Sequence, residues 1–76
     1  MRLNEALASV SERFGMPMVL ESSAPCPEGT VHAVALDGEP AEVTLPVVVE
    51  SASGDCRVVD GPSPEWLSLV ARFPDD

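Results

Sequence analysis

Thr30-Val31-His32-Ala33-Val34-Ala35-Leu36 is the stretch that decides the fold class. Successive side chains of an extended chain point to opposite sides, and in this stretch both sides are mostly apolar. One side carries Val31, Ala33 and Ala35, and the other carries His32, Val34 and Leu36. This pattern favours a strand that is covered on both faces or lies centrally in a sheet.

The residues on either side of this stretch predict another strand and a turn. Met18-Val19-Leu20 is apolar and follows a proline, which favours a first strand. The prolines, serines and glycine from Ser22 to Gly29 predict a loop between the two strands. After the stretch, Asp37-Gly38-Glu39-Pro40 is a turn signal of the hairpin type. We therefore expect the chain to reverse its direction directly after Leu36.

Two more strands are expected after this turn. The segment from Ala41 to Glu50 alternates between inward and outward residues, which predicts a third strand. Pro46 cannot donate a hydrogen bond to a neighbouring strand, so this strand is expected at an edge of the sheet or with a bulge. A second turn from Ser51 to Asp55 then leads to a short fourth strand from Cys56 to Val59.

A first helix is predicted near the beginning of the chain. It has about three turns and ends near Phe14, because Gly15 favours a left-handed C-cap and Pro17 blocks continuation. Residues at helical spacing give it one apolar face. That face consists of Leu3, Ala6, Leu7, Val10 and Phe14.

A second helix, of about ten residues, is predicted near the end of the chain. Ser63 is a good N-cap and Pro64 a good first helical residue. The apolar stripe of this helix consists of Trp66, Leu69, Val70 and Phe73. A helix of this length is not stable alone in water, so it must pack on the sheet or on a partner. The acidic tail, residues 74–76, is expected to be frayed.

Together these elements predict a single small α+β domain spanning residues 1–76. It consists of an N-terminal helix, an antiparallel sheet of about four strands and a short C-terminal helix. A chain of 76 residues has no room for a second core. Domains of this size often gain stability from a disulfide, a metal or a partner.

The charge of the chain restricts its partners. The chain has thirteen aspartates and glutamates, four arginines and no lysine, and its net charge is −9. Such a charge disfavours direct binding to nucleic acid or to an anionic membrane surface. It favours a basic protein partner, although solubility alone is an alternative explanation. Arginine without lysine, together with much alanine, valine and proline, suggests a bacterial, GC-rich source.

We expect no secretory signal and no membrane span, and therefore a cytoplasmic protein. Glu5 falls where the apolar part of a signal would begin, and the longest aliphatic run is Val47-Val48-Val49. Cys26 and Cys56 could form a disulfide, but in the cytoplasm they are expected to stay reduced. With two cysteines and one histidine, the spacing of a zinc site is missing, and no cofactor is expected.

No residue constellation commits the sequence to a reaction. His32 is the single histidine and could act as a base with Cys26 or a nearby carboxylate, but a half-buried structural histidine is the simpler interpretation. Asp37, Glu39 and Glu42 cluster at the predicted hairpin without the alternating ligands of a calcium loop. We therefore predict no catalytic and no metal site.

The apolar stripe of the second helix is the strongest candidate for a binding site. Its residues either complete the core or form a dimer or partner interface, for which tryptophan and phenylalanine are favoured anchors. The apolar residues that follow Pro46 are a second candidate, because they are expected at an edge of the sheet. An apolar sheet edge can accept a strand from another chain. The predicted partner-binding residues are Trp66, Leu69, Val70, Phe73, Val47 and Val49.

Three segments resemble class I type III secretion chaperones in their order along the chain. These are the N-terminal helix, the Phe14-Gly15-Met16-Pro17 junction and the approach to the hairpin, Val34-Ala35-Leu36-Asp37-Gly38. The resemblance covers about the first fifty residues. It implies a small acidic α+β protein that forms homodimers and holds an extended segment of another protein on its surface.

The sequence therefore leads to three functional hypotheses. The first is a protein–protein interaction module, chaperone- or adaptor-like, that binds a basic or hydrophobic protein segment. The second is an inhibitor or nucleic-acid mimic whose carboxylates occupy a basic surface. The third is a small enzyme or enzyme subunit that uses His32.

Overall fold

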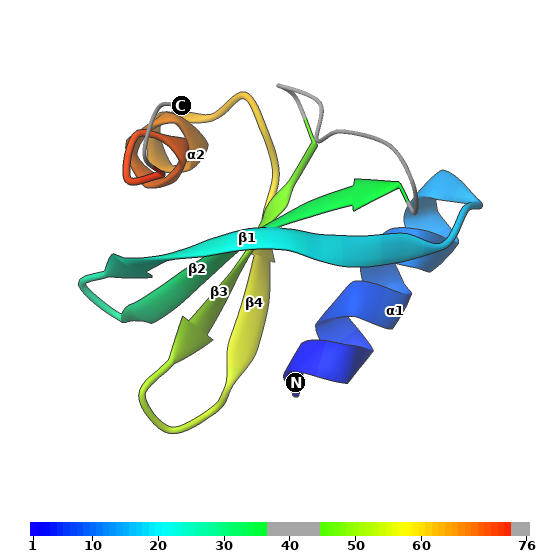
Figure 1. The fold of residues 1–76 in the computed structure, drawn as a ribbon, viewed down its shortest axis with the longest axis horizontal. Coiled ribbons are helices and arrows are strands. Elements are labelled where there is room, and N and C mark those ends of the chain that lie inside the picture. Colours follow the sequence, from blue (N-terminus) through cyan, green and yellow to red (C-terminus); the bar gives the residue numbers. More distant parts are fainter. Residues whose placement is uncertain (37–44, 74–76) are drawn as a thin grey trace.

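The computed structural model describes residues 1–36 and 45–73. Two helices lie on opposite sides of an antiparallel sheet of four strands (Figure 1). This confirms the α+β architecture that the sequence predicts. The elements are α1 (Leu3–Phe14), β1 (Met18–Cys26), β2 (Gly29–Leu36), β3 (Val47–Ser51), β4 (Cys56–Val59) and α2 (Pro64–Val70).

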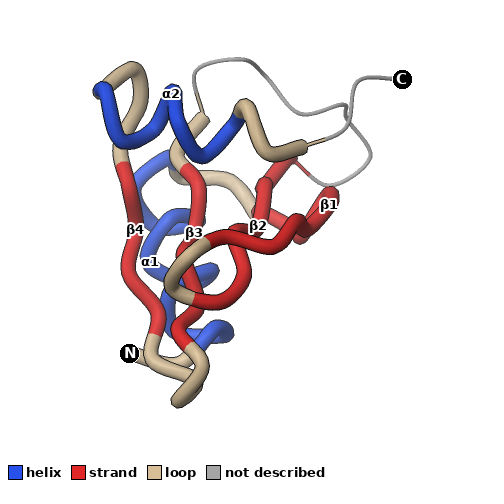
Figure 2. Tube along the Cα trace, turned by 90° about the vertical axis from the view of Figure 1, so that its left-hand side faces the viewer, coloured by secondary structure: helices blue, strands red, loops and turns tan. Residues whose placement is uncertain are grey.

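The strands are arranged in the order of the sequence, β1-β2-β3-β4, and each neighbouring pair is antiparallel. Figure 2 shows this order across the sheet, with α2 above it and α1 behind. The inner strands are β2 and β3. The predicted central position of the strand from Thr30 to Leu36 is thus confirmed, and the edges are formed by β1 and β4.

Each face of the sheet carries its own apolar core. The α1-side core is formed by Ala6, Val10, Met18, Val34, Val48 and Cys56. The α2-side core is formed by Ala24, Val31, Val47, Val49, Val59, Trp66 and Leu69. Adjacent residues of one strand enter different cores, as Val48 and Val49 do, because side chains alternate along a strand. Since both faces are covered, β2 and β3 carry apolar residues on both sides.

Local signals fix both helices. The backbone N–H of Arg2 donates to the carboxylate of Glu5 at the start of α1, and Gly15 ends that helix with φ of 69°. In α2 the hydroxyl of Ser63 accepts from the backbone N–H of Trp66, as expected of an N-cap. The indole N–H of Trp66 donates to the Leu45 carbonyl at 2.8 Å, which joins α2 to the segment before β3.

Three expectations about the elements need correction. The predicted loop from Ser22 to Gly29 is wrong, because β1 continues to Cys26 and only Pro27 and Glu28 form the turn. The second helix has seven residues instead of about ten. The third strand begins at Val47, directly after Pro46, and it is an inner strand with neighbours on both sides. Pro46 lies just before β3, so its missing donor removes no hydrogen bond from that strand, and the expected edge position is wrong.

Some expectations lie outside the described residues. These are the hairpin turn at 37–40, the first part of the strand expected from Ala41, the acidic cluster of Asp37, Glu39 and Glu42, and the frayed tail at 74–76.

Candidate functional site at the open edge of strand β1

The outer edge of β1 is the longest unpaired backbone in the described part of the molecule. The opposite edge strand, β4, has only four residues, and the N–H of its first residue, Cys56, donates to the carbonyl of Met1 at 2.6 Å. By contrast, β1 has nine residues, and among the described strands it pairs only with β2. An edge of this kind can accept a strand from another chain.

Two contacts within the described residues limit this edge at its ends. The N–H of Met18 donates to the Ser11 hydroxyl at 3.0 Å, and Arg72 donates to the Pro25 carbonyl at 3.5 Å. The open edge therefore runs from Val19 to Ala24. Its register is interrupted between Leu20 and Ser22 by a β-bulge. A bulge bends an edge strand and restricts the length of chain that can pair with it.

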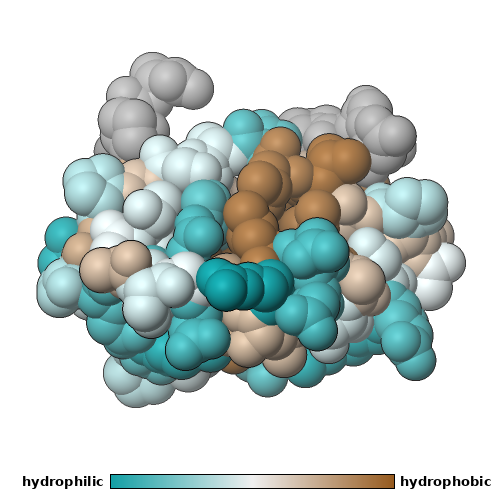
Figure 3. All heavy atoms as spheres, turned by 90° about the horizontal axis from the view of Figure 1, so that it is seen from below, coloured by the Kyte–Doolittle hydropathy of each residue, from teal (hydrophilic) through white to brown (hydrophobic). Residues whose placement is uncertain are grey.

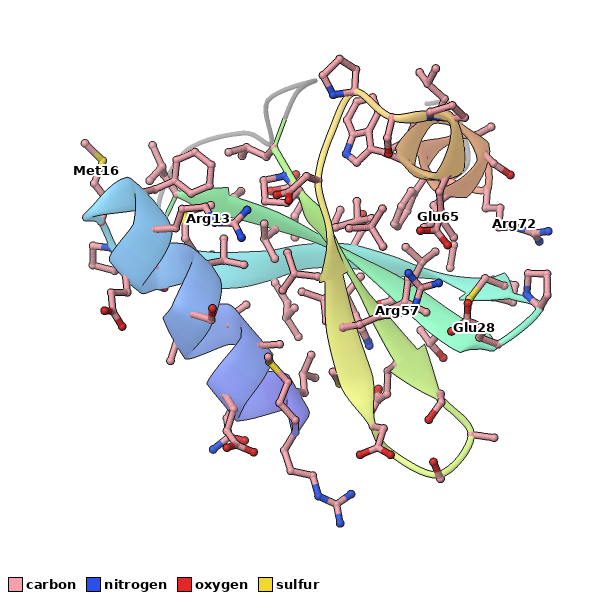
Figure 4. The ribbon with its side chains drawn as sticks, turned by 180° about the vertical axis from the view of Figure 1, so that it is seen from behind. Arg13, Met16, Glu28, Arg57, Glu65 and Arg72 are labelled. Atoms are coloured by element: carbon pink, nitrogen blue, oxygen red, sulfur yellow. The ribbon has the colours of Figure 1, made fainter. Side chains whose placement is uncertain are left out.

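Apolar side chains are exposed beside this edge. Phe14 is 43% exposed and Met16 53%, both at the end of α1, while Val19 and Leu20 are exposed on β1 itself. Met16 points away from the sheet at the tip of the helix (Figure 4). Seen from below, the molecule has an apolar strip between hydrophilic side chains (Figure 3). Exposed apolar groups that adjoin unpaired backbone are typical of a binding surface.

Two of the four arginines form ion pairs away from this edge. Arg13 pairs with Asp60, and Arg57 pairs with both Glu28 and Glu65. Figure 4 shows Arg57, Glu28 and Glu65 between the β1–β2 turn and α2, and Arg13 on the α1 side. The hydrogen bond from Arg57 lowers the pKa of Glu65, and the two carboxylates raise the pKa of Arg57. The one charged side chain of β1, Glu21, is acidic and exposed.

His32 is held between two side chains from the neighbouring strands. Its Nδ1 lies 2.7 Å from the Ser23 hydroxyl of β1, and its Nε2 lies 3.0 Å from Glu50 Oε1 of β3. His32 is 7% exposed, whereas Ser23 is exposed. The predicted partner Cys26 does not contact it, and the nearby carboxylate is Glu50. Sequence reasoning missed Ser23 because it placed that residue in a loop.

The six predicted partner-binding residues lie in or against the α2-side core. Val47, Val49, Trp66 and Leu69 are buried there, and Val70 and Phe73 pack against them. Of the alternatives left open by the sequence, the structure shows the core position for the stripe of α2. The predicted apolar edge at Val47 to Val49 is wrong, because β3 is paired on both sides. Contact of these six side chains with a partner stays a prediction, and it would require α2 to leave the sheet.

A small hollow lies between the β1–β2 turn and α2. Its volume is about 190 Å³, and Cys26, Glu28, Glu65, Leu69 and Arg72 are among its lining residues. Pockets for drug-sized ligands usually enclose about 300–1,000 Å³, so this hollow is too small for such a ligand. No group of three or more His, Cys, Asp or Glu residues suited to a metal ion occurs within residues 1–36 and 45–73.

Both cysteines are free thiols, and no helix in the described ranges is long and apolar enough to cross a membrane. Comparison of the chain with protein-family models found no match, and comparisons with curated proteins and with solved structures found none either.

Proposed function

We propose that this protein is an interaction module, chaperone- or adaptor-like, that binds a short extended segment of a basic protein along the edge of β1. The observation that carries the proposal is the open edge from Val19 to Ala24 with exposed apolar side chains beside it. A segment that adds a strand gains main-chain hydrogen bonds, and alternate side chains of the segment meet the neighbouring surface.

The position of the apolar side chains determines which segment fits. Leu20 pairs with Val34 and points to the α1 side, while Val19 pairs with Ala35 and points to the other side. A bound strand with apolar residues at alternate positions would cover Leu20 with those residues. The remaining residues of the bound strand would point away from Leu20 and stay exposed. The bulge divides this edge into two short stretches, from Val19 to Leu20 and from Ser22 to Ala24.

Charge complementarity favours a basic segment. The chain carries −9, the arginines Arg13 and Arg57 are already paired, and Glu21 projects from the edge strand. Lysine or arginine at the exposed alternate positions of the segment would be attracted by this field. A second copy of the chain is a weaker candidate, because two chains of charge −9 repel each other.

The resemblance to class I type III secretion chaperones supports a proposal of the same kind. Those proteins hold an extended segment of another protein on their surface. The exposed Phe14 and Met16 lie within the junction that carries the resemblance.

The experiment uses a labelled synthetic peptide in which lysine alternates with valine, and it measures binding by fluorescence anisotropy. We expect saturable binding that weakens with salt, because part of the attraction is electrostatic. A peptide of the same sequence with N-methyl groups on alternate residues should not bind, since it cannot donate hydrogen bonds to the edge. A peptide that alternates glutamate with valine should not bind either.

Two variants locate the site. Leu20→Asp should weaken binding of the lysine–valine peptide at least tenfold, because it places a charge in the apolar contact. Leu67→Asp is the matched control, since Leu67 is 56% exposed but lies on α2. Equal binding of the N-methylated peptide, or equal losses in both variants, would contradict the proposal. Concentration-dependent dimerisation without peptide binding would point to a second copy as the occupant.

A further inference from the structure

Ser23, His32 and Glu50 form a continuous chain of hydrogen bonds across three strands. Ser23 and His32 are direct cross-strand partners in β1 and β2, and Glu50 follows from β3 on the same face. The two distances are 2.7 Å and 3.0 Å. The order is an exposed hydroxyl, a buried imidazole and a carboxylate that orients it. This is the arrangement in which a serine hydroxyl is activated by a base.

The chemistry of the three groups fixes the direction of the hydrogen bonds. A carboxylate only accepts, so when the imidazole is neutral, its hydrogen bond to Glu50 requires the proton to be on Nε2. Nδ1 is then an acceptor, and the hydrogen bond with Ser23 is donated by the hydroxyl. His32 is therefore held in the tautomer that can remove the proton of Ser23. The roles of the two ring nitrogens are the reverse of those in the serine proteases, but either nitrogen can act as a base.

The backbone of Ser23 also faces the open edge. The turn at Pro27 and Glu28 is a two-residue hairpin loop, so the pair that flanks it, Cys26 and Gly29, is hydrogen-bonded. Hydrogen-bonded and non-hydrogen-bonded pairs alternate, which makes Ser23 and His32 a non-hydrogen-bonded pair. The N–H of Ser23 then points away from β2. Pro25 lies two residues after Ser23, so its carbonyl should also point away from β2. The hydrogen bond that this carbonyl accepts from Arg72 agrees with that direction.

We propose that Ser23 is a nucleophile for acyl transfer from neutral or cationic esters that lie in extended form along the edge of β1. Ser23 Oγ attacks the ester carbonyl carbon, and its proton moves to His32 Nδ1. The negative charge that develops on the carbonyl oxygen is stabilised by the N–H of Ser23. The alkoxide leaves with the proton from Nδ1, and the acyl group remains on Ser23.

Water completes the cycle. It attacks the acyl-Ser23 carbonyl while His32 Nδ1 takes its proton, and that proton returns to Ser23 Oγ as the carboxylic acid leaves. Glu50 acts as a positioning residue, because it holds the Nε2–H and stabilises the imidazolium. The chemical step requires only the three side chains and the N–H of Ser23, so it can be tested without the peptide, although the ester would lie along the same edge as the proposed peptide.

The test uses two probes on the full chain. The first is an alkyl fluorophosphonate, which transfers its phosphonyl group to an activated serine and releases fluoride. The second is p-nitrophenyl acetate, which releases p-nitrophenolate on acylation. We expect a single phosphonyl group on Ser23 by peptide mass spectrometry, and a burst of p-nitrophenolate of at most about one per chain. Peptide mapping separates acetylation of Ser23 from acetylation of the thiols.

The matched control is Ser22→Ala, since Ser22 is exposed on the same strand but pairs with Ala33 on the opposite face. Ser22→Ala should label like the wild type. Ser23→Ala should abolish the labelling, and His32→Gln should reduce labelling of Ser23 about 100-fold or more. If His32→Gln does not fold, Glu50→Gln replaces it. In that variant the rate of Ser23 labelling should be plotted against pH, and the midpoint of this curve should move to lower pH. Loss of packing alone would not produce this shift. An unlabelled Ser23 in the folded wild type, or equal labelling of Ser22 and Ser23, would overturn the proposal.

Discussion

Cys26 and Cys56 lie on opposite faces of the sheet. Cys26 packs against the α2-side core, and Cys56 belongs to the α1-side core. A disulfide between them would have to pass through the sheet, so the two thiols stay unpaired within one chain. The sequence left this pairing open, because spacing along the chain does not show on which face a side chain lies.

The two thiols should therefore differ in reactivity. Cys56 is 7% exposed and burial, followed by the Glu50 charge, raises the pKa of its thiol, whereas Cys26 is half-buried. At neutral pH we expect one thiol, Cys26, to react rapidly with an aromatic disulfide reagent and the other to react slowly. Absorbance kinetics with wild type and Cys26→Ser check this. Fast reaction of one thiol in the folded Cys26→Ser protein would contradict the burial of Cys56.

Much of the fold could be predicted from local signals, and the exceptions have physical reasons. The Gly15 C-cap, the Ser63 N-cap and the apolar pattern of β2 all act within a few residues, so the sequence predicts them well. The strand character of Ser22 to Cys26 could not be predicted. On an edge strand most side chains are exposed, and Pro25 is tolerated because its missing N–H would face away from β2.

The candidate site was much less predictable. Val47 and Val49 look like an apolar edge in sequence, but the pairing of β3 on both sides places them in the core. The Ser23–His32–Glu50 chain depends on the register of three strands, and a shift by one residue would turn His32 to the other face. The open edge of β1 beside Leu20, where we propose that a partner strand binds, likewise depends on how the strands pair.

Gly61 is expected to be intolerant of any side chain. A Cβ there would lie 2.5 Å from the indole ring of Trp66, which is buried and fixed by its hydrogen bond to Leu45. Gly61→Ala should lower the free energy of unfolding by about 1–3 kcal/mol, measured by urea denaturation. In a Trp66→Leu background the smaller side chain leaves space, so the added cost of Gly61→Ala should nearly disappear. An equal cost in both backgrounds would show that the clash is not the cause.

The contact between Arg57 and Glu65 predicts a pH dependence of stability. The pKa of Glu65 is lowered in the folded protein, so its contribution is fully present above the unfolded pKa of about 4.3 and is lost as the pH falls through the folded value. Glu65→Gln should therefore lower the melting temperature at pH 7, and the difference should shrink in acid. Glu21→Gln, at an exposed acid on β1, is the control and should show no such trend. The contact is exposed, so the effect should also weaken in high salt.

Trp66 distinguishes the core position of α2 from an interface role. It is the single tryptophan of the chain and is 3% exposed. Its emission should be blue-shifted and poorly quenched by acrylamide, and both properties should persist when the lysine–valine peptide binds, because the edge of β1 and α2 are separate surfaces. If a partner instead used Trp66, Leu69 and Phe73, α2 would have to leave the sheet. The emission and quenching would then change on binding, and Leu67→Asp would alter affinity while Leu20→Asp would not.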